Sequence, residues 1–211
     1  LILKDKIIFI LSRYILKNST AIVFSTNWQK EIFEKYYGLD SRKNHIIENY
    51  FEIKKLGAEN ISEKKFIWAG RPIKIKNIER LKQAFSQARK ISPELSLNIV
   101  KDMSYEKLLE EIKKSYAVIY PSLSEISPNF ILDAISYYKP FILTKESGYY
   151  EMFKSIGLFV DPLDEEDIKN KILFLADNKN YLEYKNKIIN FNYKHTWADI
   201  AGEFMNVYKN L

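Results

Sequence analysis

Residues 117–140 read AVIYPSLSEISPNFILDAISYYKP, and the rest of the chain is arranged around them. The apolar, β-branched run at their start predicts a strand that is buried on both faces. Pro121 has no amide to donate and ends that strand. Ser127 is a favoured N-cap and Pro128 suits the first helical position, so we expect a helix over residues 129–138. In an open α/β sheet, a strand that leads into a helix N-terminus is where a phosphorylated ligand binds.

Two carboxylates flank the expected start of this helix. Glu125 lies in the loop before it and Asp133 lies within it. Carboxylates repel a phosphate, but they accept hydrogen bonds from hydroxyl-rich groups on either side of one. A nucleotide sugar has this layout, with a sugar, a diphosphate and a ribose in a row. Taken singly, each residue is explained more simply as a solvated surface side chain.

A second cluster follows the strand expected at residues 66–69. Gly70 and Arg71 form a turn, and Lys76 and Asn77 precede a helix that runs to about residue 89. A glycine after a strand lets the backbone approach a phosphate closely, and Arg and Lys supply positive charge. Lysine-rich turns are usually just solvated. However, this strand is expected beside the one at residues 117–120, so both cations reach the same helix N-terminus.

Strands and helices alternate along most of the chain. This alternation over residues 65–177 predicts an α/β fold with a doubly wound, Rossmann-like parallel sheet. No G-x-G-x-x-G motif occurs, which disfavours a generic dinucleotide-binding domain. The 211 residues suffice for one large domain or one and a fraction.

Composition narrows the class of partner. The chain is 46% hydrophobic and has no cysteine, so it is not disordered, forms no disulfide and fits a reducing compartment. The net charge of +6 is spread along the sequence and suits anionic ligands or a membrane surface better than nucleic acid. The apolar run at residues 7–11 is too short to span a membrane. Because the chain begins with Leu1, we expect a piece of a longer protein.

The first cluster resembles the C-terminal signature of retaining glycosyltransferases with the GT-B fold, family 4 in particular. That signature is Glu, seven residues, Glu and Ala, followed by Gly-x-Pro; here Glu125, Asp133, Ala134 and Pro140 match it. The chain departs from it twice, because Asp133 replaces the second Glu and Tyr138 stands where the family usually has Gly. Glycine adopts a left-handed conformation at a helix C-terminus more easily than tyrosine does.

The second cluster resembles the diphosphate clamp of the same family, G-R-x(4)-K-G/N. The resemblance implies that Glu125 faces the donor sugar and Asp133 the ribose. It also implies that the diphosphate is bound by the second cluster and by the amides at the helix start. The implied donor-binding residues are Gly70, Arg71, Lys76, Glu125, Ser127, Pro128, Asn129 and Asp133, of which Glu125, Arg71 and Lys76 are the implied catalytic ones.

The implied function is transfer of a sugar from a UDP-, GDP- or ADP-sugar to a glycan or glycolipid acceptor, with retention of configuration and with no metal or cofactor. The implied location is cytoplasmic, with a peripheral contact at the inner face of the membrane. The alternative is a non-catalytic nucleotide-binding or adaptor module that keeps the fold. Asp161 and Asp164 suggest a metal site, but Asp164 is explained better as the cap of a helix over residues 165–176.

The resemblance also implies a division of the chain. Residues 1–48 are expected to be the tail of the N-terminal GT-B domain, residues 49–195 the donor-binding domain, and residues 196–211 a helix that packs back towards the first segment. A polar linker is expected over residues 52–64. Family members usually carry an additional strand–helix–strand after residue 100, whereas here Lys101 leads directly towards the next helix, so we expect a trimmed sheet.

Overall fold

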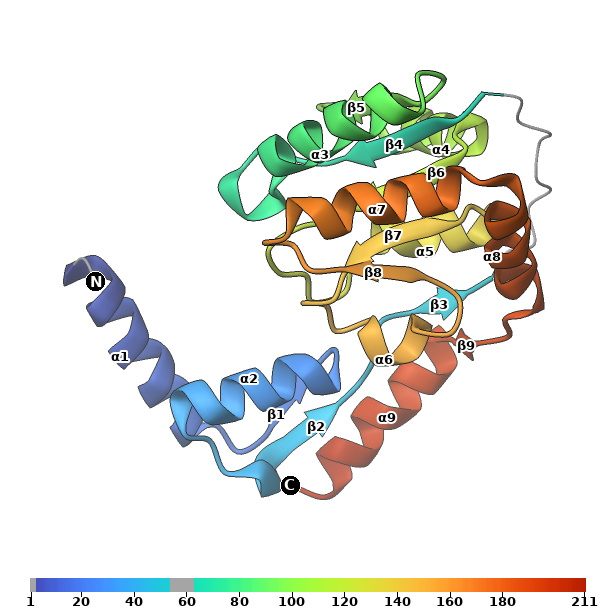
Figure 1. Ribbon diagram of the computed structural model, residues 1–211. Coiled ribbons are helices and arrows are strands. Elements are labelled where there is room, and N and C mark those ends of the chain that lie inside the picture. Colours follow the sequence, from blue (N-terminus) through green and yellow to red (C-terminus); the bar gives the residue numbers. More distant parts are fainter. Residues whose placement is uncertain (1–2, 54–62) are drawn as a thin grey trace. The chain divides into compact units, whose positions relative to one another are not determined.

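The computed structural model describes residues 3–53 and 63–211 (Figure 1). The chain forms two compact units, one made of the residues up to Phe51 together with His195–Leu211, the other of Glu52–Lys194. That the functional domains are residues 1–48, 49–195 and 196–211 stays a prediction. Most of the linker expected at residues 52–64 lies outside the described residues.

A five-stranded parallel sheet forms the centre of the second unit. Its order is β5-β4-β6-β7-β8, and every neighbouring pair is parallel. The strands are β4 (Lys65–Ala69), β5 (Ser96–Val100), β6 (Ala117–Tyr120), β7 (Phe141–Thr144) and β8 (Leu158–Val160). The chain runs outward from β4 to β5 and then returns to the other side of β4, so the strand order reverses between β4 and β6. This is the switch point at which open α/β sheets bind ligands, and the expected doubly wound fold is confirmed.

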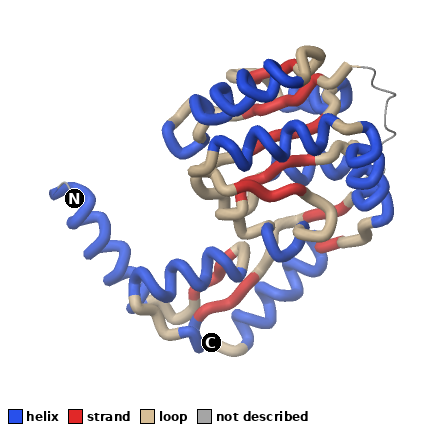
Figure 2. The backbone as a smooth tube through the Cα atoms, in the orientation of Figure 1, coloured by secondary structure: helices blue, strands red, loops and turns tan. Residues whose placement is uncertain are grey.

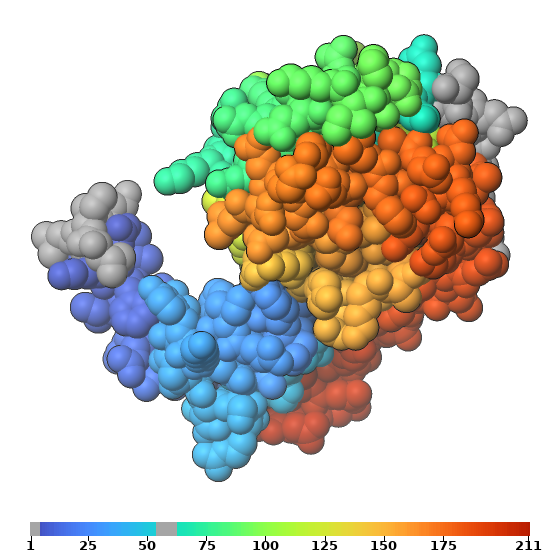
Figure 3. Space-filling view, in the orientation of Figure 1, coloured from blue at the N-terminus to red at the C-terminus, as the bar shows by residue number. Residues whose placement is uncertain are grey.

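Helices cover both faces of this sheet (Figures 1 and 2). They are α3 (Ile78–Ile91), α4 (Tyr105–Lys114), α5 (Asn129–Ser136), α6 (Tyr150–Phe153), α7 (Glu165–Ala176) and α8 (Asn178–Asn190). Helices α3 and α7 pack on each other, as do α4 and α5. Figure 3 shows the α3 and α7 regions meeting on the face of this unit that is in view.

Apolar runs in the sequence account for the core of the second unit. All four residues of β6 and all four of β7 are buried, and Phe66, Ile67 and Trp68 of β4 are fully buried. Burial of both faces is typical of a parallel sheet that is covered by helices. Asp164 caps α7 as the sequence predicts, because its side chain accepts hydrogen bonds from the amides of Glu166 and Asp167.

Helix α5 differs from its sequence prediction at both ends. Pro128, with an extended backbone at ψ 108°, is the N-cap, so the prediction of Ser127 as the cap is wrong by one residue. The carbonyl of Pro128 accepts a hydrogen bond from the amide of Ile131 at 3.0 Å. The helix ends at Ser136 because Tyr138 has a left-handed φ of 55°.

The left-handed residue closes a Schellman motif at the end of α5. The amide of Tyr138 donates to Ile135 and the amide of Lys139 donates to Ala134, at 3.0 and 2.9 Å. This geometry normally selects glycine, because an L-residue with a Cβ is disfavoured there by roughly 1–2 kcal/mol. Tyr138 therefore completes this turn at a cost in strain.

The first unit combines helices with short strands. They are α1 (Leu3–Asn18), β1 (Ile22–Phe24), α2 (Asn27–Tyr37), the 3-10 turn η1 (Ser41–Lys43), β2 (Asn44–Ile46) and α9 (Trp197–Lys209). Strands β1 and β2 pair in parallel, and Thr26 and Gly38 cap the two ends of α2. Two further strands, β3 (Phe51–Glu52) and β9 (Lys194–His195), pair with each other.

Histidine 195 has a structural position in the first unit. Its ring nitrogens lie 3.3 Å from the carbonyl oxygen of Asn49 and 3.1 Å from Oε1 of Glu203. It therefore links the segment before β3 to α9, which agrees with the absence of any catalytic motif around it. Over the described ranges, no helix combines the length and the apolar character needed to cross a membrane.

Candidate donor-binding site

The turn after β4 requires a glycine. Gly70 has a φ of 151°, and a Cβ at this position would lie 3.3 Å from Oη of Tyr120 and 3.6 Å from the ring of Trp68. The Gly70 amide donates to the carbonyl of Val100 at 3.2 Å. The turn is therefore fixed against both neighbouring strands, at the carboxyl end of the sheet.

Asn77 anchors the start of α3 to two other loops. It adopts a left-handed backbone with φ 54° and ψ 31°, which Gly and Asn tolerate better than other residues. Its buried amide nitrogen donates to the carbonyls of Pro121 at 2.9 Å and Pro162 at 2.7 Å. Arg80 donates to the Asn77 side-chain oxygen and to Pro162, at 2.9 and 3.0 Å. Asn77 therefore ties together the loops that follow β4, β6 and β8.

The 3-10 turn η2 (Lys74–Lys76) places the predicted cation Lys76 against the loop that follows β6. Nζ of Lys76 lies 2.6 Å from Oε1 of Glu125 and 4.8 Å from the centre of the Tyr120 ring. Burial alone would lower the pKa of Lys76, but its interactions with Glu125 and Tyr120 outweigh burial and raise that pKa above its ordinary value. The sequence assigned Lys76 to the diphosphate and Glu125 to the sugar, and the structure brings the two into direct contact.

The backbone around Glu125 is held by the loop after β7. Its amide donates to the carbonyl of Glu146 at 2.9 Å, and its carbonyl accepts from the amide of Gly148 at 3.0 Å. Glu125 and Ser147 thus form an isolated parallel bridge. The side chain of Glu125 is largely buried, so its carboxylate has little freedom to leave the Lys76 ammonium.

Arg71 is exposed beside the same tyrosine. Burial raises the pKa of the Tyr120 hydroxyl, and the positive charges of Lys76 and Arg71 partly oppose that rise. Within the part of the chain that the structure describes, no carboxylate forms an ion pair with Arg71. Its charge is therefore available to a ligand at the edge of the sheet.

The first turn of α5 presents unpaired backbone amides. The amide of Ile131 bonds to Pro128, whereas those of Asn129 and Phe130 have no partner among the described residues. Pro128 has no side chain that can cap them. Amides at a helix start carry partial positive charge and bind anions. This end of α5 lies only a few residues after Glu125.

Asp133 has a different neighbour from the other predicted residues. Oη of Tyr105, at the start of α4, donates to Oδ1 of Asp133 at 2.7 Å. Burial raises the pKa of Asp133 above its ordinary value, and the hydrogen bond from Tyr105 opposes this. Burial and the Asp133 carboxylate together raise the pKa of Tyr105 to about 12, so the phenol stays a donor. No motif in the sequence marks Tyr105, and its role emerges only from the fold.

The aspartates after β8 are engaged within the fold. Asp161 pairs with Lys145 at 2.6 Å and accepts from the amide of Leu163 at 2.9 Å, while Asp164 caps α7. Across residues 3–53 and 63–211, no three His, Asp or Glu side chains gather closely enough to hold a metal ion.

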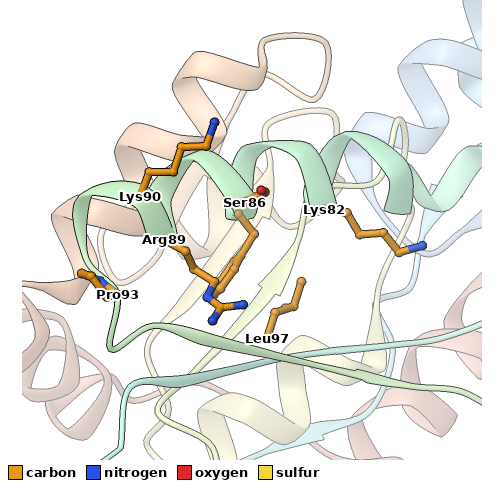
Figure 4. A pocket seen from close by; sticks show the side chains of 7 residues that line it. Lys82, Ser86, Arg89, Lys90, Pro93 and Leu97 are labelled. Atoms are coloured by element: carbon orange, nitrogen blue, oxygen red, sulfur yellow. The ribbon is translucent and has the colours of Figure 1, made fainter.

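A separate groove of about 400 Å³ lies along α3 and β5 (Figure 4). None of the predicted donor-binding residues lines it. Its lining residues are Lys82, Phe85, Ser86, Arg89, Lys90, Pro93 and Leu97.

Solved structures with the same fold are glycosyltransferases of the GT-B type. Sucrose-phosphate synthase from Thermosynechococcus elongatus superposes with a TM-score of 0.75 at 16% identity, covering 98% of this chain and 62% of that one. Anabaena HepE in complex with UDP-glucose gives a TM-score of 0.78 at 12% identity, covering 96% and 67%. TarM gives a TM-score of 0.73 at 16% identity, covering 93% of this chain but only 45% of TarM.

At these identities the likeness shows the fold alone, and the chain spans about half the length of TarM. A comparison with curated proteins gives no significant match. Residues 52–195, which include every residue of the candidate site, match the family described as Glycosyl transferases group 1. The chain belongs to the group 1 glycosyltransferase family.

Proposed function

We propose that this chain is the donor-binding half of a retaining glycosyltransferase that uses a nucleotide-diphosphate sugar. The observation that carries the proposal is the contact between Lys76 and Glu125 at 2.6 Å, at the carboxyl ends of β4 and β6. It joins the two sequence clusters in one place, a few residues before the unpaired amides of α5. Each cluster alone has a simpler structural explanation, whereas their convergence at the switch point of the sheet matches a ligand site.

The diphosphate is bound by fixed donors in this proposal. The Gly70 turn lets the backbone approach it, Arg71 offers a guanidinium, and the start of α5 offers the amides of Asn129 and Phe130. An ammonium has three donor hydrogens, so Lys76 can hold Glu125 and a phosphate oxygen together. These groups would stabilise the charge that develops on the leaving diphosphate. Because they are already in place, little reorganisation accompanies that step.

Glu125 orients the donor sugar, and Asp133 binds the ribose. The bridge to Ser147 fixes the backbone of Glu125 and Lys76 holds its Oε1, so the other carboxylate oxygen can accept a sugar hydroxyl. Asp133 keeps one oxygen, Oδ2, outside its bond with Tyr105. Departure of the diphosphate and attack by the acceptor on the same face would retain the anomeric configuration without a protein nucleophile.

The donor nucleotide and the acceptor are inferred by analogy with similar solved structures. HepE is described in complex with UDP-glucose, and TarM with UDP and alpha-GlcNAc-glycerol. We infer for this protein a UDP-, GDP- or ADP-sugar donor, a glycan or glycolipid acceptor, and no metal or other cofactor. A cytoplasmic location with a peripheral contact at the membrane completes it, in line with the lack of cysteine.

Calorimetric titration with UDP, GDP and ADP in the presence of a chelator tests the proposal. Binding of at least one of them without divalent cation is expected, because amides and cations neutralise the diphosphate. Binding that requires added cation would contradict this account.

Two substitutions then separate the roles of the carboxylates. Glu125→Ala should weaken a nucleotide sugar several-fold and leave the bare diphosphate nearly unchanged, whereas Asp133→Ala should weaken both ligands alike. Equal losses for both ligands in Glu125→Ala would remove Glu125 from the sugar.

The alternative is a non-catalytic nucleotide-binding or adaptor module. The observation that favours it is the sheet itself, which has five strands and passes directly from β5 to α4. The two functions differ in one measurement. Suppose that the nucleoside diphosphate binds, and that Glu125→Ala leaves the ratio of the affinities for nucleotide sugar and nucleoside diphosphate unchanged. The non-catalytic binding module is then the better description.

A further inference from the structure

Strand β5 lies at one edge of the sheet, where it pairs only with β4 among the described strands. The amide of Ser96 donates to Lys64 at 3.1 Å, and the carbonyl of Val100 accepts from Gly70 at 3.2 Å. Backbone groups alternate in direction along a strand, so the N–H and C=O groups of Leu97 and Ile99 point away from β4. Such groups form a template for pairing with another chain.

The groove of about 400 Å³ runs beside this edge. Residues 82, 85, 86, 89 and 90 lie on one stripe of α3, at the spacing that brings helical side chains onto one face. Phe85, which is 2% exposed, and Leu97 of β5 supply its apolar lining. Arg89 points from α3 towards the strand that carries Leu97 (Figure 4). An apolar floor and a cationic rim thus follow the open strand.

Carboxylates neutralise part of the charge on this rim. Glu79 pairs with Lys82 at 2.8 Å and Glu94 with Lys64 at 3.0 Å. In the described ranges, neither Arg89 nor Lys90 forms an ion pair. Cations near a helix C-terminus and beside an edge strand are also common as structural features. They interact favourably with the helix dipole and discourage edge-to-edge pairing with strands of other molecules.

These features discriminate between partners. A second copy that paired through its own β5 would bring like charges together, because Arg89 of one copy would face the same rim of the other. An acidic strand would instead place carboxylates against Arg89 and Lys90 while it uses the open groups of β5. Opposite charge at such an edge sets which segment can pair and in which register.

We propose that β5 and the groove of Lys82, Ser86, Arg89 and Lys90 receive an extended acidic segment of a partner protein. The segment adds to the sheet as a strand beside β5, and hydrogen bonds to Leu97 and Ile99 fix its backbone. Its carboxylates lie against Arg89 and Lys90. This surface is distinct from the proposed donor site, because Arg89 lies in the last turn of α3 and Lys76 precedes its first.

Fluorescence anisotropy with three labelled peptides tests the proposal on the full chain. The first alternates Glu with Thr, the second replaces Glu by Gln, and the third replaces Thr by Pro. The third keeps the charge of the first but cannot form a strand ladder, because Pro has no amide to donate. We expect the Glu-Thr peptide to bind at least about tenfold more tightly than either of the others.

Charge reversal locates the binding. Arg89→Glu combined with Lys90→Glu should weaken the Glu-Thr peptide by about tenfold or more, whereas Lys179→Glu, an exposed cation on α8, should change it less than about twofold. Bound peptide should also slow hydrogen exchange at the amides of Leu97 and Ile99. Circular dichroism, together with calorimetry on any nucleoside diphosphate that binds, checks that the variants are folded.

Four results would overturn the proposal. They are no binding of the Glu-Thr peptide at millimolar concentration, equal binding of the Glu-Pro peptide, equal binding after charge reversal, and unchanged exchange in β5. Tighter binding of single-stranded RNA to the same cations, without protection of β5, would identify a different class of partner. Failure of the proposed donor site leaves all these measurements unaffected, so the two proposals stand or fall separately.

Discussion

Replacement of Lys76 by Met is the most informative perturbation of the candidate site. The side chains of Lys76 and Glu125 are only 18% and 10% exposed, and their charged atoms are 2.6 Å apart. A surface pair contributes about 0–1 kcal/mol, whereas a charge-assisted hydrogen bond away from solvent contributes about 1.5–3 kcal/mol. The bridge to Ser147 prevents the Glu125 backbone from carrying the carboxylate out to water. We therefore expect Lys76→Met to lower the free energy of unfolding by about 2–3 kcal/mol.

Glu125→Gln should cost less than Lys76→Met, about 1 kcal/mol, because a neutral amide can still accept a hydrogen bond and the flexible lysine stem can turn towards solvent. In the double variant the two losses should not add, since both variants remove the same interaction. Lys145 supplies a matched control. It pairs with Asp161 at the same 2.6 Å, but the two side chains are 46% and 37% exposed. Lys145→Met should therefore cost less than about 1 kcal/mol.

Urea unfolding followed by tryptophan fluorescence measures the stability of each variant, and calorimetry measures its affinity for whichever of UDP, GDP and ADP binds the unchanged chain. Lys76→Met should weaken binding of that nucleotide by roughly tenfold to a hundredfold. Glu125→Gln should leave its binding unchanged or strengthen it slightly, because the ammonium is then free for phosphate. The reasoning is refuted if the losses of Lys76→Met and Glu125→Gln add in the double variant. It is also refuted if Lys76→Met costs no more than Lys145→Met.

The remaining predictions concern stability. Tyr138→Gly should raise the unfolding free energy by about 0.5–1 kcal/mol, because glycine removes the strain at φ 55°; lower stability in urea would contradict this. Burial would lower the pKa of His195, but the interaction with Glu203 outweighs burial and raises that pKa. The protonated ring therefore stabilises the fold fully below pH ~6.5, and this stabilisation is lost as pH rises through the higher pKa of the folded state. His195→Gln should accordingly lower the melting temperature more under mildly acidic than under alkaline conditions, and equal losses would refute the pairing. A Cβ at Gly157 would overlap the Phe141 ring, so Gly157→Ala should destabilise by about 1–3 kcal/mol in urea, and unchanged stability would show that the ring moves aside.

The fold was predictable because its signals are local. The apolar runs of β4, β6 and β7 are short and bounded by turn residues, and the caps at Thr26 and Asp164 lie within three residues of the amides that they bind. Burial and capping act over a few residues, so a sequence shows them directly. The one misplaced cap, at Ser127, arose because Pro128 occupies the N-cap position although its side chain accepts no hydrogen bond there.

The site was predictable only in part because its contacts are distant in sequence. Lys76 and Glu125 are 49 residues apart, Asn77 and Pro121 are 44 apart, and Tyr105 and Asp133 are 28 apart. Motif spacing predicts which residues form the site, but not that Lys76 and Glu125 pair with each other. Tyr105 carries no motif, and only the packing of α4 on α5 reveals its contact with Asp133. That each predicted residue binds a ligand stays a prediction.

The pairing of Lys76 with Glu125 lowers the net positive charge of the site. Without a ligand, the charges of the ammonium and the carboxylate largely cancel, so the attraction for an anion comes mainly from Arg71 and the amides of α5. In the proposed function, a diphosphate bound there would share the ammonium and loosen its hold on Glu125. Since Tyr120 and the bridge to Ser147 keep both partners in place, the released carboxylate oxygen would stay beside the phosphate. The same contact that stabilises the empty site would then make the acceptor for a sugar hydroxyl depend on the diphosphate being bound.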